Sequence, residues 1–342
     1  MERILENEGR IAYVDLAKGI CICIVMLFHI KGIERCEYLF DPILFSFCML
    51  PPFFFLSGLF FKEERSFSAF IRKKTNRLLI PFAFFYLTTS VIMPNVLHSL
   101  LGVDFQTVLG WPSLWAFVWP GEYPNIPLWF LWCLFVMSIL FRAMLTGARK
   151  CFPHRSLTVL VVLSLGCAIV GTFVEYTFQA DVANLLSALK NMPFFCLGYM
   201  AKRKEMVRGM AHTGKLSREA VLVLSFSVML LDYLPSLQGS VATETVLFYL
   251  CSVAGIVFLL TLCSLVGHLP LISYLGQYSI IVLLTHGLFV RVGAPFVLLL
   301  SQYTNPHCAT LCFWLLMMVS YWIVIPFCRR YLPHVTAQKP LW

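Results

Sequence analysis

The sequence predicts an all-α fold, a polytopic bundle of about ten transmembrane helices with both termini in the cytoplasm. Three observations lead to this prediction. The 342-residue chain is 59% hydrophobic and only 13% charged, and its mean hydropathy of +0.81 exceeds that of soluble domains. Apolar stretches of transmembrane length recur along the whole chain, and lysine and arginine gather in alternate loops between them.

The spans follow one another with short polar connections. We place them at residues 11–31, 42–61, 78–98, 126–145, 156–174, 184–201, 219–234, 245–266, 272–298 and 309–327. The first span lacks a small-residue cleavage site after its apolar run, so we interpret it as a retained anchor rather than a signal peptide. No remaining stretch is long and polar enough for a soluble domain. We therefore predict a single membrane domain over 1–342.

The loop charges set the orientation. The loops "FKEERSFSAFIRKKTNR" (61–77), "RAMLTGARKCFPHR" (142–155) and "KRKEMVRGMAHTGKLSR" (202–218) are basic, whereas the loops between them are almost free of lysine and arginine. Short basic loops stay on the cytoplasmic side, so these loops and both termini are predicted to lie inside. The net charge of +9 is thus a sign of topology, and we expect no nucleic-acid partner.

The thirteen cysteines show no metal or disulfide spacing. Cys21 and Cys23 are two residues apart and point to different helix faces, and no Cys-x-x-Cys occurs. Free cysteine inside a span behaves as a small apolar residue. We predict no metal site, because the ligand patterns of zinc are missing.

Three ionisable residues share one face of the first span. Lys18 and His29 are eleven residues apart, which is close to three helical turns, or about 16 Å along the axis. Asp15 precedes Lys18 by three residues and is placed to pair with it. Charged groups at membrane depth are rare and need a partner or a task. One interpretation is a buried ion pair with a structural histidine; the alignment of all three favours a water-filled or ligand-filled path.

The first span, "RIAYVDLAKGICICIVMLFHI", resembles the opening helix of the acyltransferase type 3 family of integral membrane O-acyltransferases. The signature of that helix is a basic residue, ten further residues and a histidine. Later segments are similar to the family's other spans in the expected order. These are "LPPFFFLSGLFF" (50–61), "RKKTNRLLIPF" (72–82), "PLWFLWCLF" (127–135), "MPFFCLGYMAKRK" (192–204) and "YLGQYSIIVLLTHGLF" (274–289).

Within that family the chain most resembles the short, single-domain branch similar to fucose O-acetylases. Two positions depart from the pattern. Lys18 stands where the family usually has arginine, which keeps the charge but loses the bidentate fork. Met49, Leu50 and Pro51 stand where the branch often has His-Met-Pro, so any role of that second histidine is absent.

The resemblance implies transfer of an acyl group, usually acetyl, from cytoplasmic acyl-CoA to a hydroxyl of a cell-surface glycan or a lipid-linked sugar. Acetyl-CoA would be a substrate, with no permanently bound cofactor, and polysaccharide modification at the bacterial cytoplasmic membrane is the expected setting. His29 is the candidate general base, with Asp15 and Lys18 completing the catalytic set. The anionic donor would meet a basic cytoplasmic mouth formed by Arg10, Lys18, Arg72, Lys73, Lys74 and Arg77.

The acceptor site has weaker candidates. Ser57, before Gly58 at a helix end, suits either an oxyanion donor or close helix packing. His286 lies in the penultimate span and suits a structural hydrogen bond or catalysis. In the segment 111–129, aromatic and acidic residues suit sugar stacking or a membrane-interface belt. The acceptor candidates there are Trp115, Trp119 and Glu122.

Two other classes of function remain open from sequence. A transporter or flippase would need broken helices near mid-membrane in both halves, and we find no convincing pair. A sensory protein would usually carry a soluble module.

Sidedness is a further expectation: counted from Arg10, His29 lies about 28 Å along the helix, close to the outer face. This favours a through-membrane site, in which acyl-CoA enters from the cytoplasm and the hydroxyl acceptor approaches from outside or from the outer leaflet. A tilted helix or a water-filled inner vestibule would permit a cytoplasmic acceptor instead. The oligomeric state is left open.

Overall fold

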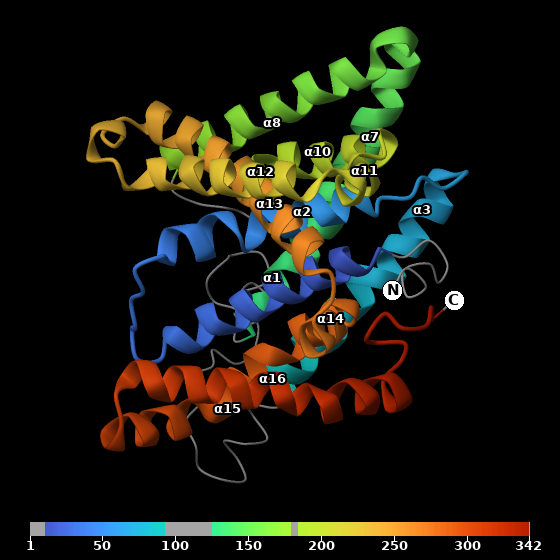
Figure 1. Ribbon diagram of the computed structural model, residues 1–342. Helices are drawn as coiled ribbons and strands as arrows, with labels where there is room; N and C mark the ends of the chain where they lie inside the picture. Colours follow the sequence, from blue (N-terminus) through green and yellow to red (C-terminus); the bar gives the residue numbers. More distant parts are fainter. Residues whose placement is uncertain (1–10, 93–124, 179–183, 342) are drawn as a thin grey trace. The chain divides into compact units, whose positions relative to one another are not determined.

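The computed structural model describes residues 11–92, 125–178 and 184–341, and Figure 1 draws the elements in order. Every regular element in these residues is helical, of α, 3-10 or π type, which confirms the all-α prediction for the part described. The described residues form two compact units. The first holds residues 11–61, 197–282 and 290–322, and the second holds the rest. The chain thus passes between the units repeatedly, and the single-domain assignment stays a prediction.

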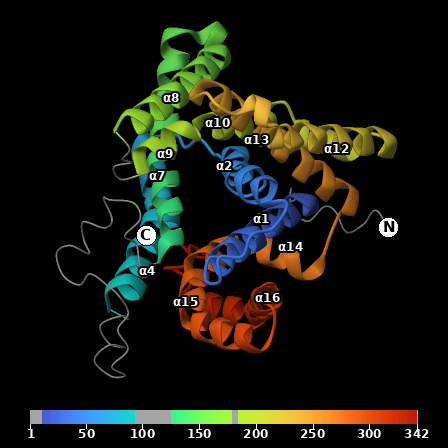
Figure 2. The same cartoon turned by 90° about the vertical axis from the view of Figure 1, so that its left-hand side faces the viewer.

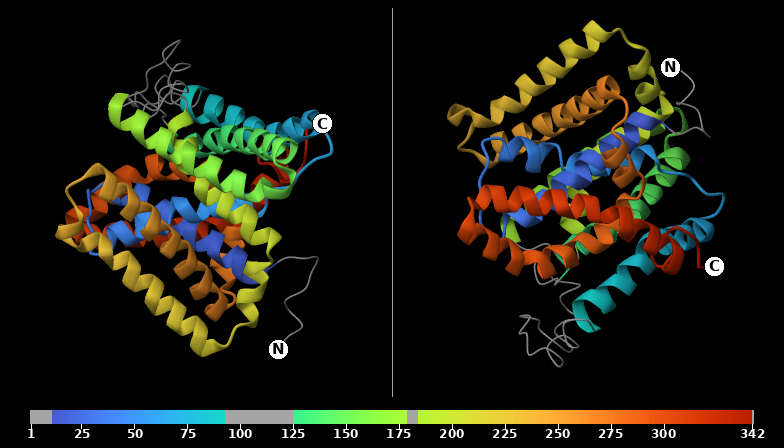
Figure 3. Two further views of the ribbon diagram at one scale, coloured as in Figure 1. Left: turned by 90° about the horizontal axis from the view of Figure 1, so that it is seen from above. Right: turned by 60° about the horizontal axis from the view of Figure 1, so that its bottom comes forward.

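The first unit contains the helix that carries Asp15, Lys18 and His29, which together we call the polar stripe, and the helices that pack on it. Its elements are α1 (Ala12–Lys31), a π-helix (Pro42–Phe47), α2 (Leu50–Leu59), α11 (Met206–His212), α12 (Lys215–Met229), two 3-10 turns (Leu230–Tyr233 and Pro235–Leu237), α13 (Val241–Val266), α14 (Pro270–Gln277) and most of α15 (Ser279–Tyr303) and α16 (Pro306–Tyr331). Within this unit α1 packs against α14, α13 and α2, and α12 forms a hairpin with α13 (Figure 3).

The second unit carries the basic loop. Its elements are α3 (Phe67–Lys74), a π-helix (Thr75–Leu79), α4 (Ile80–Phe85), a π-helix (Tyr86–Ile92), a 3-10 turn (Ile126–Leu128), α7 (Trp129–Cys151), a 3-10 turn (Pro153–Arg155), α8 (Ser156–Phe178) and α9 (Leu185–Lys190). The helix α10 (Met192–Arg203) bridges the two units in sequence. Within this unit α7 packs on α8 and α9, as Figure 2 shows for α7 and α9.

Seven of the ten predicted spans are helices long and apolar enough to cross a membrane. They are Ala12–Lys31, Pro42–Leu59, Ile126–Cys151, Pro153–Phe178, Val241–Val266, Ser279–Tyr303 and Pro306–Tyr331. The other three are shorter or divided. The span 184–201 is interrupted at Asn191, α12 ends at Met229, and 78–98 changes helix type and runs beyond the described residues. Ten spans and cytoplasmic termini therefore stay predictions, and a multi-pass membrane protein is supported.

The backbones of α1 and α14 touch, and two glycines allow it. A Cβ atom placed on Gly276 would come closer than 3.0 Å to the carbonyl oxygen of Asp15, and one on Gly19 would overlap the carbonyl oxygen of Ile272. Small residues permit such close approach of membrane helices. A second contact fixes the middle of α1, where the indole N–H of Trp314 donates to the Cys23 carbonyl at 2.8 Å. The position of α1 in its unit is therefore closely defined.

The thirteen cysteines are all free thiols, and most are buried, as expected for small apolar residues of the spans.

Candidate functional site

His29 lies near the C-terminal end of α1 and is oriented by its own helix. Its Nδ1 atom is 2.8 Å from the carbonyl oxygen of Val25. A carbonyl oxygen only accepts hydrogen bonds, so Nδ1 carries the proton and donates it. In the neutral ring Nε2 is then unprotonated and able to accept a proton from a substrate. The hydrogen bond to the helix thus makes Nε2 the basic nitrogen of the half-buried neutral imidazole.

Aromatic and charged side chains surround this end of α1. The Phe28 ring packs edge-on against His29, with 5.5 Å between centroids, and lies 5.3 Å from Phe45. Lys31 pairs with Asp41 and places its ammonium 4.5 Å from the centre of the Phe45 ring. The structure therefore places aromatic faces and a paired charge around this end of α1.

Asp15 and Lys18 form the other end of the stripe, near the start of α1. The Lys18 ammonium is 3.4 Å from an Asp15 carboxylate oxygen, which confirms the predicted pairing. The same ammonium lies 4.0 Å from the centre of the Phe60 ring, a cation–π contact that the sequence did not reveal. Both side chains keep some exposure, 22% for Lys18 and 13% for Asp15, so the charges are not sealed in the core.

The stretch of α1 between these ends is apolar and buried. Ile22 and Val25 lie on the same helix face as Lys18 and His29 by the 3.6-residue period, and they are 0% and 5% exposed. In the described residues the face of α1 between Lys18 and His29 is therefore covered. The physical reason is that α14, α13 and α2 pack around the helix and enclose its middle. The stripe consists of two polar ends separated by packed side chains.

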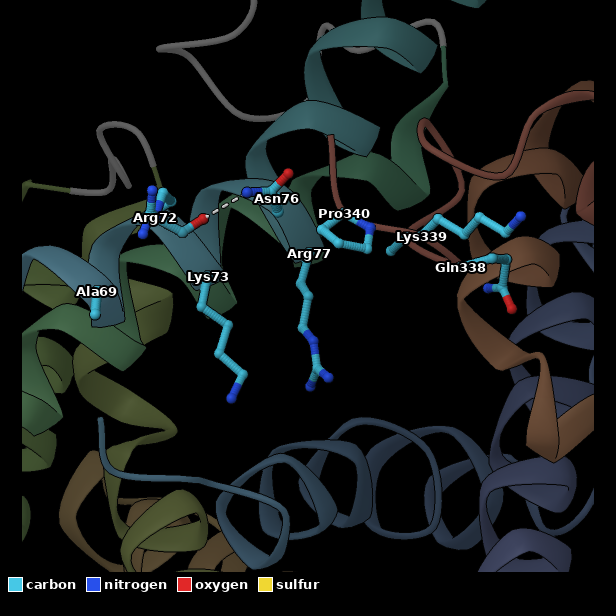
Figure 4. Close-up of a pocket in the computed structure, with 9 residues that line it drawn as sticks. Ala69, Arg72, Lys73, Asn76, Arg77, Gln338, Lys339 and Pro340 are labelled. Atoms are coloured by element: carbon cyan, nitrogen blue, oxygen red, sulfur yellow. Dashed lines mark hydrogen bonds between the residues drawn. The ribbon is translucent and has the colours of Figure 1, made fainter. Parts of the chain in front are cut away.

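A basic pocket lies in the second unit, on α3 and the π-helix that continues it. Its volume is about 300 Å³. Three of the predicted donor-binding residues line it: Arg72, Lys73 and Arg77. Figure 4 shows Lys73 and Arg77 extending in parallel from this helix, with the C-terminal segment crossing beside them. The structure thus brings three of the six residues predicted for the basic mouth around one cavity.

The cationic side chains around this pocket differ in whether they form an ion pair. Lys73 pairs with Glu64 and, by donating a hydrogen bond to it, lowers the pKa of that carboxyl. No ion pair of the described residues involves Arg72 or Arg77. Lys74 is not among the lining residues and lies 5.6 Å from the centre of the Phe70 ring. Burial, followed by the charges of Arg77 and Lys73, lowers the pKa of Lys74 to about 8.

The remaining candidates fall in different places. Arg10, Trp115, Trp119 and Glu122 lie outside the described residues. Ser57 is half-buried in α2. The neighbouring turns of α2 touch α10 closely, because a Cβ on Gly198 would overlap the Phe55 carbonyl oxygen. This supports the packing interpretation of the small residues there.

His286 is fully buried in α15, within the second unit. Beside this turn lies Asn125, which sequence reasoning missed. Its amide donates to Thr89 Oγ1 at 2.9 Å and to the Leu284 carbonyl at 3.2 Å. A Cβ on Gly287 would overlap the Asn125 side chain. The only sequence signal for this contact is an asparagine directly before Ile-Pro, which marks a turn but not its partner.

A family model described as an acyltransferase domain matches residues 11–326 of the chain. It covers the polar stripe, the loop of Arg72, Lys73 and Arg77, and His286. No curated protein and no solved structure matches the chain. The match extends over nearly all of the sequence, and the described helices include seven that are able to span a membrane. The chain is therefore a membrane-bound acyltransferase that belongs to the acyltransferase type 3 family.

Proposed function

We propose that the protein transfers an acyl group, most simply acetyl, from cytoplasmic acyl-CoA to a hydroxyl of a cell-surface glycan or lipid-linked sugar. The observation that carries this proposal is the hydrogen bond from His29 Nδ1 to the Val25 carbonyl. It leaves Nε2 as a base, and a sugar hydroxyl is a poor nucleophile that needs one. Membership of the branch similar to fucose O-acetylases, and acetyl as the transferred group, are parts of this proposal.

The chemistry requires one base and a place for the donor's charge. Nε2 of His29 takes the hydroxyl proton as the oxygen attacks the thioester carbonyl. The tetrahedral adduct collapses, the carbon–sulfur bond breaks, and the imidazolium returns the proton to the departing thiolate. The products are an O-ester and free CoA, and no oxidant or reductant is consumed. Arg72, Arg77 and Lys73 are proposed to bind the phosphates, since charge-assisted hydrogen bonds to phosphate are strong.

Thioester-dependent product formation by the purified protein tests the proposal. Acetyl-CoA and a hydroxyl-bearing glycan should give free CoA and an acylated product in equal amounts, with the mass of one acetyl group added. Release of the acyl group by mild alkali would show an ester. A transporter or flippase would move its substrate without consuming the thioester, so a protein that transports but releases no CoA would overturn the assignment.

Replacing Lys18 tests the charge at the start of α1. Lys18→Ala should raise the KM for acyl-CoA by about tenfold or more, the scale of one hydrogen bond to a charged group, and it leaves Asp15 without the ammonium 3.4 Å away. Lys18→Arg should be tolerated, because it keeps the charge. Lys215→Ala, at an exposed lysine beside Glu219, is the control. An inactive Arg variant together with a fully active Ala variant would contradict the charge requirement.

Sealed membrane vesicles test the sidedness. Asp15 and Lys18 lie near the start of α1 and His29 near its end, and its 20 residues span about 30 Å at 1.5 Å per residue. That length matches the hydrocarbon core. In inside-out vesicles, acyl-CoA added outside should therefore acylate an acceptor trapped in the lumen. Acylation only of an acceptor added on the acyl-CoA side would refute the through-membrane model and leave the acyltransferase assignment intact.

A further inference from the structure

We propose that the C-terminal tail, residues 332–341, is a wall of the basic pocket, and that its Lys339 and Gln338 bind phosphate groups together with Arg72 and Arg77. Ala337, Gln338, Lys339 and Pro340 all line the cavity. The inference rests on the proposed function, because acyl-CoA is the phosphate-bearing substrate of that reaction.

The tail is folded back on itself rather than loosely attached. The backbone N–H groups of Gln338 and Lys339 both donate to the Pro333 carbonyl, at 2.9 and 3.0 Å. The buried Thr336 hydroxyl donates to the Leu332 carbonyl at 2.7 Å. Ala337 has a φ of 58°, a left-handed conformation that alanine adopts only at a cost. These contacts hold the turn that presents positions 338 and 339 to the pocket.

Asn76 ties the tail to the helix that carries the arginines. Its Oδ1 accepts the Leu341 N–H at 2.7 Å, and its Nδ2 donates to the Arg72 carbonyl at 3.0 Å. The side chain is buried, with Asn76 only 5% exposed. Figure 4 shows the Asn76–Arg72 hydrogen bond, with Pro340 beside Asn76 and Arg77. One amide therefore sets the position of the tail relative to both arginines.

The charge of the pocket identifies the kind of ligand. The residues lining it in the described part of the chain include four cations and no acid: Arg72, Lys73, Arg77 and Lys339. Of these cations, Lys73 also forms an ion pair with Glu64. A cavity lined by cations without an acid attracts anions. Guanidinium and ammonium groups with an amide donor suit a phosphate ester. Two sources share this chemistry, namely the phosphates of CoA and the headgroup of an anionic lipid.

Binding to the full-length purified protein tests the tail. The probes are CoA and adenosine 3′,5′-bisphosphate in detergent, and phosphatidylglycerol in nanodiscs otherwise made of phosphatidylcholine. Lys339→Gln should weaken CoA and the bisphosphate about tenfold or more, as loss of a charge-assisted contact implies, and Lys339→Arg should restore binding. Ala337→Val should give a similar loss with no change of charge, because a β-branched residue resists the left-handed turn. Lys150→Gln, at an exposed lysine of α7, is the control.

The outcomes separate the inference from the proposed function. Unchanged CoA and lipid affinities in Lys339→Gln and Ala337→Val, with wild-type thermal stability, would overturn the role of the tail and leave acyl transfer standing. If the same variants bind phosphatidylglycerol more weakly but CoA with unchanged affinity, the tail binds the phosphate of a lipid headgroup. The pocket would then not be part of the donor site. A wild-type protein that binds neither probe would overturn both the tail and the proposed donor pocket.

Discussion

His29→Ala is expected to lower the turnover number by about 100-fold to 10,000-fold, the range supplied by a positioned general base. The loss should fall on the chemical step, because the imidazole is proposed to accept the hydroxyl proton. The side chain is half-buried at the end of α1, so truncation removes little packing and the fold should persist. The measurement is kcat for CoA release and acyl transfer by the purified variant, alongside its thermal unfolding midpoint.

His29→Gln separates the base from the shape of the side chain. The glutamine amide is able to donate to the Val25 carbonyl as Nδ1 does at 2.8 Å, but it accepts no proton near neutral pH. It should be as inactive as alanine and should bind CoA with wild-type affinity. Wild-type turnover in either purified variant would show that His29 is structural and that another group deprotonates the acceptor.

Gly276→Ala is expected to destabilise the protein by about 1–3 kcal/mol or more, the usual cost of overpacking a close contact. The new Cβ would overlap the Asp15 carbonyl oxygen and also lie close to the Gly19 nitrogen. These are backbone atoms, which cannot rotate away, so α1 and α14 must separate. Because Asp15 is moved directly, transfer activity should fall together with the thermal midpoint measured in detergent.

Gly166→Ala is the matched control for this substitution. It lies in α8, where an added Cβ meets nothing within 4 Å. Alanine in a helix is favoured over glycine by about 1 kcal/mol, so this variant should be as stable as the wild type or more stable. A Gly276→Ala protein with wild-type stability and activity would mean that the two helices are further apart than described.

Features that depend on local periodicity could be predicted from the sequence. The seven helices that are long and apolar enough to cross a membrane follow from apolar runs of sufficient length. The pairing of Asp15 with Lys18 follows from their separation by three residues, and the closeness of Arg72 and Arg77 follows from adjacency in the chain. Each of these features is determined by residues within a few turns of one another.

Features that depend on distant segments could not be predicted in this way. Burial of Ile22 and Val25 is decided by the helices that surround α1, and the sequence of α1 alone looks the same with or without them. The cation–π contact joins Lys18 in α1 to Phe60, the residue that follows α2. The tail reaches its pocket through a hydrogen bond between Asn76 and Leu341, 265 positions apart. No short sequence motif predicts a contact between residues so far apart in the chain.

The bond that orients His29 is made to the main chain of its own helix. Every amino acid has a carbonyl, so no side-chain replacement at position 25 can delete this acceptor as long as the turn stays helical. The orientation of the imidazole is thus independent of the side chain at position 25. Under the proposed mechanism, changes in the surrounding loops and helices that alter the acceptor would leave this hydrogen bond in place.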